Sequence, residues 1–141
     1  MERVGGVIVS HGQLANELLA AAATLIGEIN HLTAVSIGWH DDVEMAREQV
    51  ERAIKSVSAG RGVLVMTDMF GGTPTNIAAM FLSDGEVEIV TGVNLPMVIK
   101  LASNTKDISL SELAREVEEQ GKNSIYRTSV LLEPQRAKKD A

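Results

Sequence analysis

A run of three β-branched residues, Val7-Ile8-Val9, constrains the fold of this chain more than any other feature. No polar residue interrupts the run, as expected of a strand that is buried on both faces of a parallel sheet. The run stops at Ser10-His11-Gly12, and an Ala- and Leu-rich pattern with helical spacing follows at once. His11 is therefore predicted at the carboxyl end of a central strand, the edge at which open α/β sheets bind ligands. From position alone, a polar residue that merely ends the strand is an equally good interpretation.

The rest of the chain alternates between apolar runs and helical patterns. Further strands are predicted at residues 32–37, 63–66 and 86–90. Helical spacing follows each of them, and Asp41 and Ser109 are expected to cap two of the helices. This alternation predicts an α/β fold, a three-layer sandwich with a mainly parallel four-stranded sheet and helices on both faces. The last apolar stretch, residues 125–132, is expected to form a C-terminal edge strand.

The composition excludes several classes of protein. The chain has 141 residues, 45% of them hydrophobic and 3% aromatic, which suits one domain with an aliphatic core. A net charge of -6 argues against nucleic acid or an anionic membrane as the main partner. There is no cysteine, no signal-peptide pattern and no apolar run near the ~20 residues needed to cross a bilayer. We expect a soluble, cytoplasmic domain at residues 1–132 and a charged, disordered tail at 133–141.

A carboxylate ends the second fully apolar run in the same way as His11 ends the first. Asp68 follows Val63-Leu64-Val65-Met66 and Thr67. If the two strands are neighbours, His11 and Asp68 lie side by side at one edge of the sheet. A carboxylate that accepts a hydrogen bond from one imidazole nitrogen leaves the other nitrogen with a free lone pair, as a neutral nucleophile or base. A structural cap on the loop behind it is the alternative role for Asp68.

The loop after Asp68 is typical of a small anion site. Gly71 and Gly72 allow backbone N–H groups to point into one concavity. Thr73 adds a hydroxyl donor and, with Pro74 after it, is predicted as the N-cap of a helix whose free N–H groups face the anion. The helix after Gly12 is expected to bring a second N-terminus to the same point. Such a site suits a phosphoryl group, although a Gly-Gly pair alone is more often a plain turn.

Other familiar sites lack support in the sequence. No GxxxxGK(S/T) or GxGxxG loop predicts nucleotide binding, and no GxSxG elbow predicts a serine hydrolase. His31, His40, Asp41 and Asp42 have no recognised spacing for a metal site, and we predict no metal or other cofactor. Receiver domains have the same architecture, but they need paired acidic residues where this chain has Ser10-His11.

Three blocks of the sequence resemble the mannose-type enzyme IIA proteins of the bacterial phosphoenolpyruvate:sugar phosphotransferase system (PTS). They are VIVSHGQLA at residues 7–15, TDMFGGTPTNIA at 67–78 and TGVNLPM at 91–97. The resemblance implies a phosphotransferase in which His11 takes a phosphoryl group on Nε2 from the carrier protein HPr and passes it to an enzyme IIB. It also implies that Asp68 holds the other ring nitrogen. Gly71 and Gly72 match glycines of the family, and Thr73 stands where the family has a small hydroxyl residue near the phosphoryl group.

The same resemblance implies partners and an assembly. Family members are typically homodimers whose C-terminal strand can cross to the partner subunit, a part that residues 125–132 are able to play. Many relatives continue into a IIB domain, whereas this sequence ends at Ala141, so a free-standing IIA without direct membrane insertion is expected. Two alternatives stay open: a regulatory phosphoacceptor with a transcriptional or kinase partner, and a non-catalytic anion-binding module. The sugar is not specified.

Overall fold

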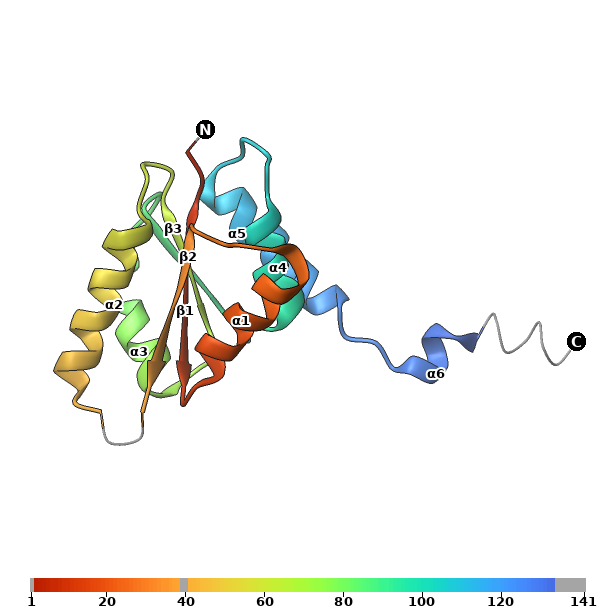
Figure 1. Cartoon of the computed structure of the whole chain (residues 1–141), viewed down its shortest axis with the longest axis horizontal. Coiled ribbons are helices and arrows are strands. Elements are labelled where there is room, and N and C mark those ends of the chain that lie inside the picture. Colours follow the sequence, from red (N-terminus) through yellow and green to blue (C-terminus); the bar gives the residue numbers. More distant parts are fainter. Residues whose placement is uncertain (1, 39–40, 134–141) are drawn as a thin grey trace, which may run out of the picture.

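The fold is a parallel sheet of four strands with helices on both faces (Figure 1). The computed structural model describes residues 2–38 and 41–133. The strands are β1 (Gly5–His11), β2 (Leu32–Ile37), β3 (Val63–Thr67) and β4 (Val87–Thr91). The helices are α1 (Leu14–Ile26), α2 (Val43–Val57), α3 (Gly72–Ala79), α4 (Leu95–Ser103), α5 (Leu110–Asn123) and α6 (Thr128–Leu131). The predicted three-layer α/β sandwich is confirmed.

The two strands with continuous apolar runs occupy the centre of the sheet. The strand order is β2-β1-β3-β4, and all three pairings are parallel. Val7, Ile8 and Val9 are fully buried, and so is all of β3. β4 is half-buried along its whole length, as its alternating pattern predicts for an edge strand.

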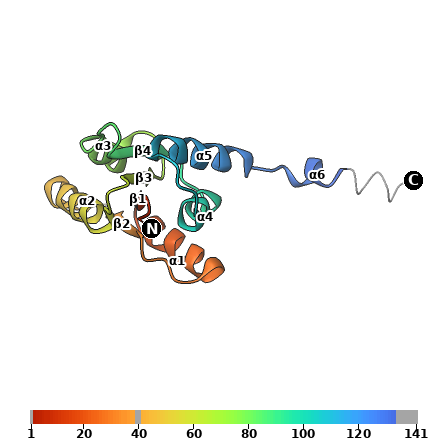
Figure 2. The same cartoon turned by 90° about the horizontal axis from the view of Figure 1, so that it is seen from above.

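Alternate side chains of the central strands pack into two separate aliphatic clusters. On one face, Ile8, Leu64 and Met66 pack among α1, α4 and α5. On the other face, Val7 and Val65 pack against α2 and α3. Figure 2 shows the sheet between these two groups of helices. Burial of this aliphatic surface supplies most of the driving force for folding, at about 25 cal/mol per Å².

The pairing of β1 with β3 decides what lies at the carboxyl edge of the sheet. Val9 is opposite Thr67 in the register, so the next residues of both strands leave the sheet at the same edge. Asp68 follows Thr67 directly, and His11 comes two residues after Val9. The predicted neighbourhood of the two strands is therefore confirmed.

The predicted N-cap of α2 is wrong by one residue. Asp42, not Asp41, is the N-cap of α2, and its Oδ1 accepts a hydrogen bond from the Glu44 N–H at 3.1 Å. Asp41 instead accepts a hydrogen bond from the Gly38 N–H at 2.6 Å, so its carboxylate is committed to the turn after β2. Ser109 caps α5 as predicted, through the Glu112 N–H at 3.1 Å.

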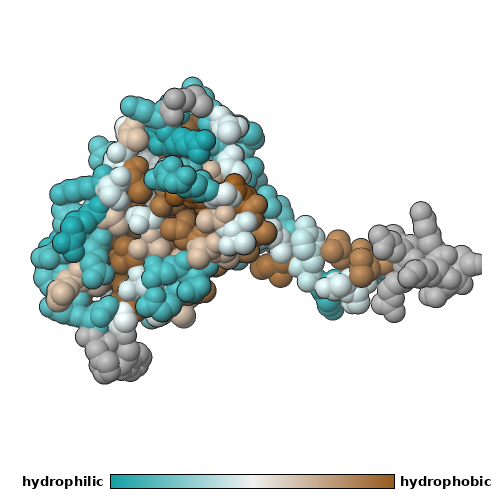
Figure 3. All heavy atoms as spheres, in the orientation of Figure 1, coloured by the Kyte–Doolittle hydropathy of each residue, from teal (hydrophilic) through white to brown (hydrophobic). Residues whose placement is uncertain are grey.

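The C-terminal segment does not form the strand that its apolar pattern predicts. After α5 the chain projects away from the body (Figures 1 and 3). Residues 128–131 form the single turn α6. A strand needs a neighbour for its backbone groups, whereas a helical turn satisfies them locally, here through the Leu132 N–H to the Thr128 carbonyl at 3.0 Å. Of the predicted tail, residues 134–141 lie outside the described residues. No helix in the described part is long and apolar enough to cross a membrane.

Candidate functional site

His11 and Asp68 form a hydrogen-bonded pair at the carboxyl edge of the sheet, as the sequence predicts. His11 is the last residue of β1, and its side chain is 50% exposed, against 11% for Asp68. The ring Nδ1 lies 2.8 Å from Asp68 Oδ2. The backbone N–H of His11 donates to the same oxygen at 2.9 Å. One carboxylate oxygen therefore fixes both the backbone and the ring of His11.

The surroundings of Asp68 keep its carboxylate ionised. Burial raises the pKa of this carboxyl. The backbone and ring hydrogen bonds from His11, the charge of that ring when protonated and the hydrogen bond from the Met69 N–H lower the pKa. Together they outweigh burial, so the net shift of the pKa is downward. The Met69 N–H donates to Asp68 Oδ1 at 3.0 Å. Because an ionised carboxylate only accepts hydrogen bonds, His11 carries its proton on Nδ1. In the neutral ring, Nε2 is then left with a free lone pair.

Gly72 lies directly against this free nitrogen. A Cβ built on Gly72 would be 3.1 Å from His11 Nε2 and 3.3 Å from Cε1. Gly71 and Gly72 have φ of 90° and 83°, in the region that favours glycine. Because α3 begins at Gly72, the positive end of its dipole lies beside Nε2.

Thr73 lies in the first turn of α3 and is not the N-cap that the sequence predicts. The N-cap is Gly71, so α3 begins earlier than predicted. Thr73 and Pro74 therefore belong to the helix itself. Proline fits any position of the first turn, because the N–H groups there have no partner within the helix.

The second helix N-terminus expected at this site is largely occupied by serine side chains. Ser10 and Ser36 face each other in the register of β1 and β2. Ser10 Oγ accepts a hydrogen bond from the Ala15 N–H at 2.6 Å, and Ser36 Oγ accepts a longer one from the Asn16 N–H at 3.4 Å. These N–H groups of α1 are thus used within the protein. An anion bound at this point would therefore be held mainly by the start of α3.

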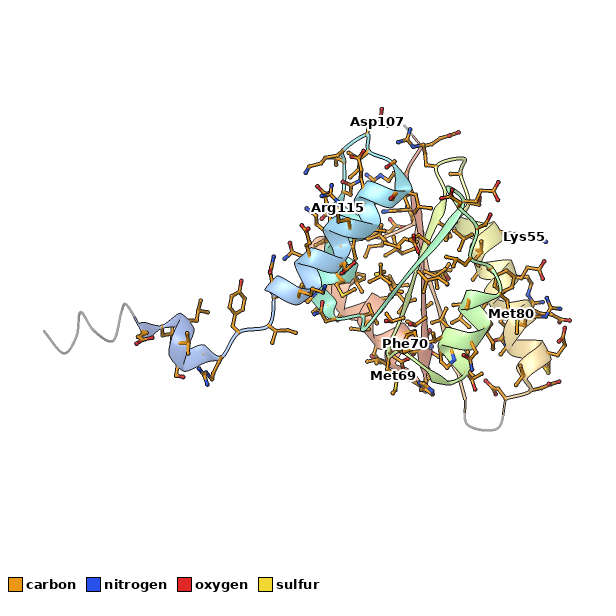
Figure 4. The ribbon with its side chains drawn as sticks, turned by 180° about the vertical axis from the view of Figure 1, so that it is seen from behind. Lys55, Met69, Phe70, Met80, Asp107 and Arg115 are labelled. Atoms are coloured by element: carbon orange, nitrogen blue, oxygen red, sulfur yellow. The ribbon has the colours of Figure 1, made fainter. Side chains whose placement is uncertain are left out.

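A further residue at the site was missed in the sequence. Thr75 is buried in α3, and its hydroxyl donates to the carbonyl oxygen of Met69 at 2.6 Å. Its sequence context marks it only as an ordinary helix residue, so the residues gave no signal for this contact. The loop held in this way presents two exposed apolar side chains, Met69 and Phe70, at the edge of the sheet where α3 begins (Figure 4). Phe70 is 83% exposed.

His31, the one other histidine that the structure describes, lies elsewhere. His31 immediately precedes β2 and therefore lies at the opposite edge of the sheet from His11, as predicted. Burial, followed by the charge of Arg3, lowers the pKa of His31. His40 is outside the described residues. In residues 2–38 and 41–133, no group of three or more His, Asp or Glu side chains is arranged to hold a metal ion.

Comparison with known proteins identifies the family of this chain. A family model described as "PTS system fructose IIA component" matches residues 5–118. The fructose-specific EIIA component of the PTS from Bacillus subtilis is 30% identical over 128 residues, which cover 90% of this chain and 88% of that protein. The mannose-specific EIIAB component from Escherichia coli is 31% identical over 121 residues, 84% of this chain. The match spans only 38% of the length of that EIIAB protein.

A solved structure has the same fold. The mannose/sorbose-specific IIA subunit of the phosphotransferase system from Enterococcus faecalis superposes with a TM-score of 0.79 at 27% identity. The superposition covers 88% of this chain and 93% of that subunit. The similarity therefore extends over nearly the whole described body of the chain.

Proposed function

The chain belongs to the mannose-type enzyme IIA family of the phosphoenolpyruvate:sugar phosphotransferase system, and we propose that it is a phosphoryl carrier with His11 Nε2 as the acceptor atom. The donor is the phosphohistidine of HPr, and the recipient is an enzyme IIB component. The observation that carries this proposal is the 2.8 Å contact between His11 Nδ1 and Asp68 Oδ2. This contact leaves Nε2 as the reactive nitrogen of a half-exposed ring.

Transfer at this site needs no general base. The lone pair of Nε2 attacks phosphorus, the N–P bond of the donor breaks, and the electron pair of that bond stays on the donor nitrogen. The proton on Nδ1 remains on the His11 ring, where Asp68 Oδ2 accepts its hydrogen bond. Phosphoryl transfer depends mostly on in-line positioning and on stabilising the charge of the equatorial oxygens.

The start of α3 is suited to stabilising that charge. Gly72 lies beside Nε2, and the dipole of α3 has its positive end there. We assign the backbone N–H groups of Gly72 and Thr73, with the Thr73 hydroxyl, as donors to the phosphoryl oxygens. After transfer, the new negative charge lies close to the Asp68 carboxylate. This repulsion favours onward transfer over a stable phosphoprotein.

Two other functions use the same residues differently. A regulatory phosphoacceptor would have the same chemistry at His11 but a transcriptional or kinase partner, and genes for IIB, IIC and IID components beside this gene would argue against it. A non-catalytic anion-binding module would take up no covalent phosphate. The relatives are named for fructose and for mannose, so the proposal leaves the sugar open.

We also propose that the protein works as a homodimer. Ile125, 78% exposed, and Tyr126, 61% exposed, lie on the segment that projects from the body. Within the described sheet β3 is the only strand that pairs with β4. Apart from a single bridge between Val87 and Ser83, the outer edge of β4 has no partner in the described residues. An open edge and an unpaired apolar segment complement each other across two copies of the chain. The resemblance to dimeric IIA proteins supports this arrangement.

Reconstitution tests the proposed function. The protein is incubated with phosphoenolpyruvate, enzyme I and HPr, and its intact mass is measured. We expect the mass to increase by one phosphoryl group only when all three are present, and the phosphate to be labile in acid. A protein that stays unmodified under these conditions would instead be an anion-binding module.

A further inference from the structure

Thr75 holds the loop that carries Asp68. The loop runs from the end of β3 to the start of α3, and Asp68, Met69 and Phe70 lie between these elements. The Thr75 side chain reaches back from α3 and donates its hydroxyl proton to the Met69 carbonyl at 2.6 Å. This length lies within the normal range for an O–H···O hydrogen bond.

Both backbone polar groups of Met69 form hydrogen bonds with side chains. Its carbonyl accepts from Thr75, and its N–H donates to Asp68 Oδ1 at 3.0 Å. The other oxygen of Asp68 contacts the His11 ring at 2.8 Å. A continuous series of hydrogen bonds therefore leads from the buried Thr75 hydroxyl, through Met69 and Asp68, to the half-exposed His11 ring.

The Thr75 hydroxyl is buried, so little water can reach the Met69 carbonyl to replace it as a hydrogen-bond donor. Thr75 is 9% exposed and Thr67, whose Oγ1 lies 3.4 Å from Thr75 Oγ1, is fully buried. Because the Thr75 proton is committed to the Met69 carbonyl, Thr67 is the donor between the two hydroxyls. The loop itself supplies little rigidity, since it ends in Gly71 and Gly72, which restrict the backbone least.

We propose that Thr75 is a positioning residue for the phosphoacceptor, which orients His11 through the Met69 backbone and the Asp68 carboxylate. The effect on phosphoryl transfer rests on the proposed function, whereas the effect on the His11 ring does not. The hydroxyl, not the bulk of the side chain, carries this role. It sets the position of Asp68 Oδ2 relative to His11 Nδ1, and hence the direction in which the lone pair of Nε2 points.

Two substitutions separate the hydroxyl from the packing. Thr75→Val keeps nearly the same volume and removes the hydroxyl, whereas Thr75→Ser keeps the hydroxyl and removes a methyl group. Val117→Ala is the control, because Val117 is fully buried in α5, on the opposite face of the sheet from α3. Each variant is measured for thermal melting, for the rate of phosphoryl transfer from phospho-HPr, and for the ¹⁵N chemical shifts of the His11 ring, which report the tautomer.

We expect Thr75→Val to slow transfer about 10-fold or more, since misplacement by about 1 Å can cost 10²-fold. Its ring shifts should move from those of the Nδ1–H form toward a mixture of tautomers. Thr75→Ser should keep both properties, and Val117→Ala should melt lower with both unchanged. Native ring shifts in Thr75→Val, or equal losses in the Ser and Val variants, would overturn the proposal. If the wild type takes up no phosphate, the proposed function fails, and the ring shifts alone still decide the role of Thr75.

Discussion

His11 Nε2 and the backbone of Gly72 face each other so closely that a Cβ on Gly72 would lie 3.1 Å from the nitrogen. The same glycine has a φ of 83°, which a residue with a side chain adopts only with strain. Two independent constraints, one on backbone conformation and one on space, therefore favour glycine here. Only the second constraint concerns the reacting nitrogen.

Gly72→Ala should block phosphoryl transfer more than it destabilises the fold. The added methyl group occupies the space from which phosphorus must approach Nε2, so we expect a loss of about 100-fold or more in the transfer rate. Gly85→Ala is a matched control, because its φ of 77° causes similar strain while a Cβ there meets no atom within 4 Å. Both variants should melt lower by similar amounts. Equal transfer rates in the two variants would show that Gly72 does not border the reaction path.

Asp68→Asn should leave the fold intact and slow transfer. An amide can donate to Nδ1 of His11, which moves the ring proton to Nε2 and removes the lone pair that attacks phosphorus. Loss of the analogous carboxylate in a serine protease triad costs ~10⁴-fold. We expect a smaller loss, since transfer between histidines relies more on positioning.

A carboxylate at the far edge of the sheet is the control for Asp68. Asp107 pairs with Arg61 at 2.7 Å, and Figure 4 places it at the opposite end of the molecule from Met69 and Phe70. Asp107→Asn should transfer phosphate at the wild-type rate. If transfer is also unchanged in Asp68→Asn, Asp68 is only a structural cap.

Thr73→Ala should have a milder effect than any change at His11. It removes one of several donors proposed around the phosphoryl oxygens, and a single oxyanion donor contributes at most about 2.7–4 kcal/mol. Because Gly71 is the N-cap of α3, the loss of a threonine cap, typically ~1 kcal/mol, does not apply. We therefore expect slower transfer with nearly unchanged melting, and recovery in Thr73→Ser. Lower melting with normal transfer would assign Thr73 to the fold alone.

The sequence was sufficient to predict the pair at the centre of the site. Two apolar runs identify two buried strands, and a parallel sheet brings the carboxyl ends of neighbouring strands to one edge. The contact between His11 and Asp68 follows from these facts once the strands are adjacent, as they are. The start of α3 was harder to predict, because Pro74 fits more than one position of a first helical turn.

The contacts around this pair depend on information that the local pattern lacks. Ser10 and Ser36 both accept hydrogen bonds from the first N–H groups of α1, because the register of β1 and β2 places the two serines opposite each other. The apolar runs in the sequence do not fix that register. Thr75 gives no local signal, since its partner is a carbonyl six residues earlier in the chain. At residues 125–132, a strand requires a partner that the single chain does not supply.

A dimer is expected in solution. Light scattering at micromolar concentration should give twice 15.1 kDa. Tyr126→Asp should weaken the dimer, because it places a charge on the apolar segment proposed to meet the second copy. Leu25→Asp changes an equally exposed apolar residue at the end of α1 and should leave the mass unchanged. A monomeric mass for the wild type would contradict the assembly.

The intact mass of His11→Ala after incubation with phosphoenolpyruvate, enzyme I and HPr tests the central claim most directly. His11 ends a buried strand, contacts Asp68 at 2.8 Å and lies beside the start of α3, whereas His31 lies at the opposite edge of the sheet. The wild type, His31→Ala and His40→Ala should each gain one phosphoryl group, and His11→Ala should gain none. An acid-labile phosphate on the His11→Ala protein would contradict the account.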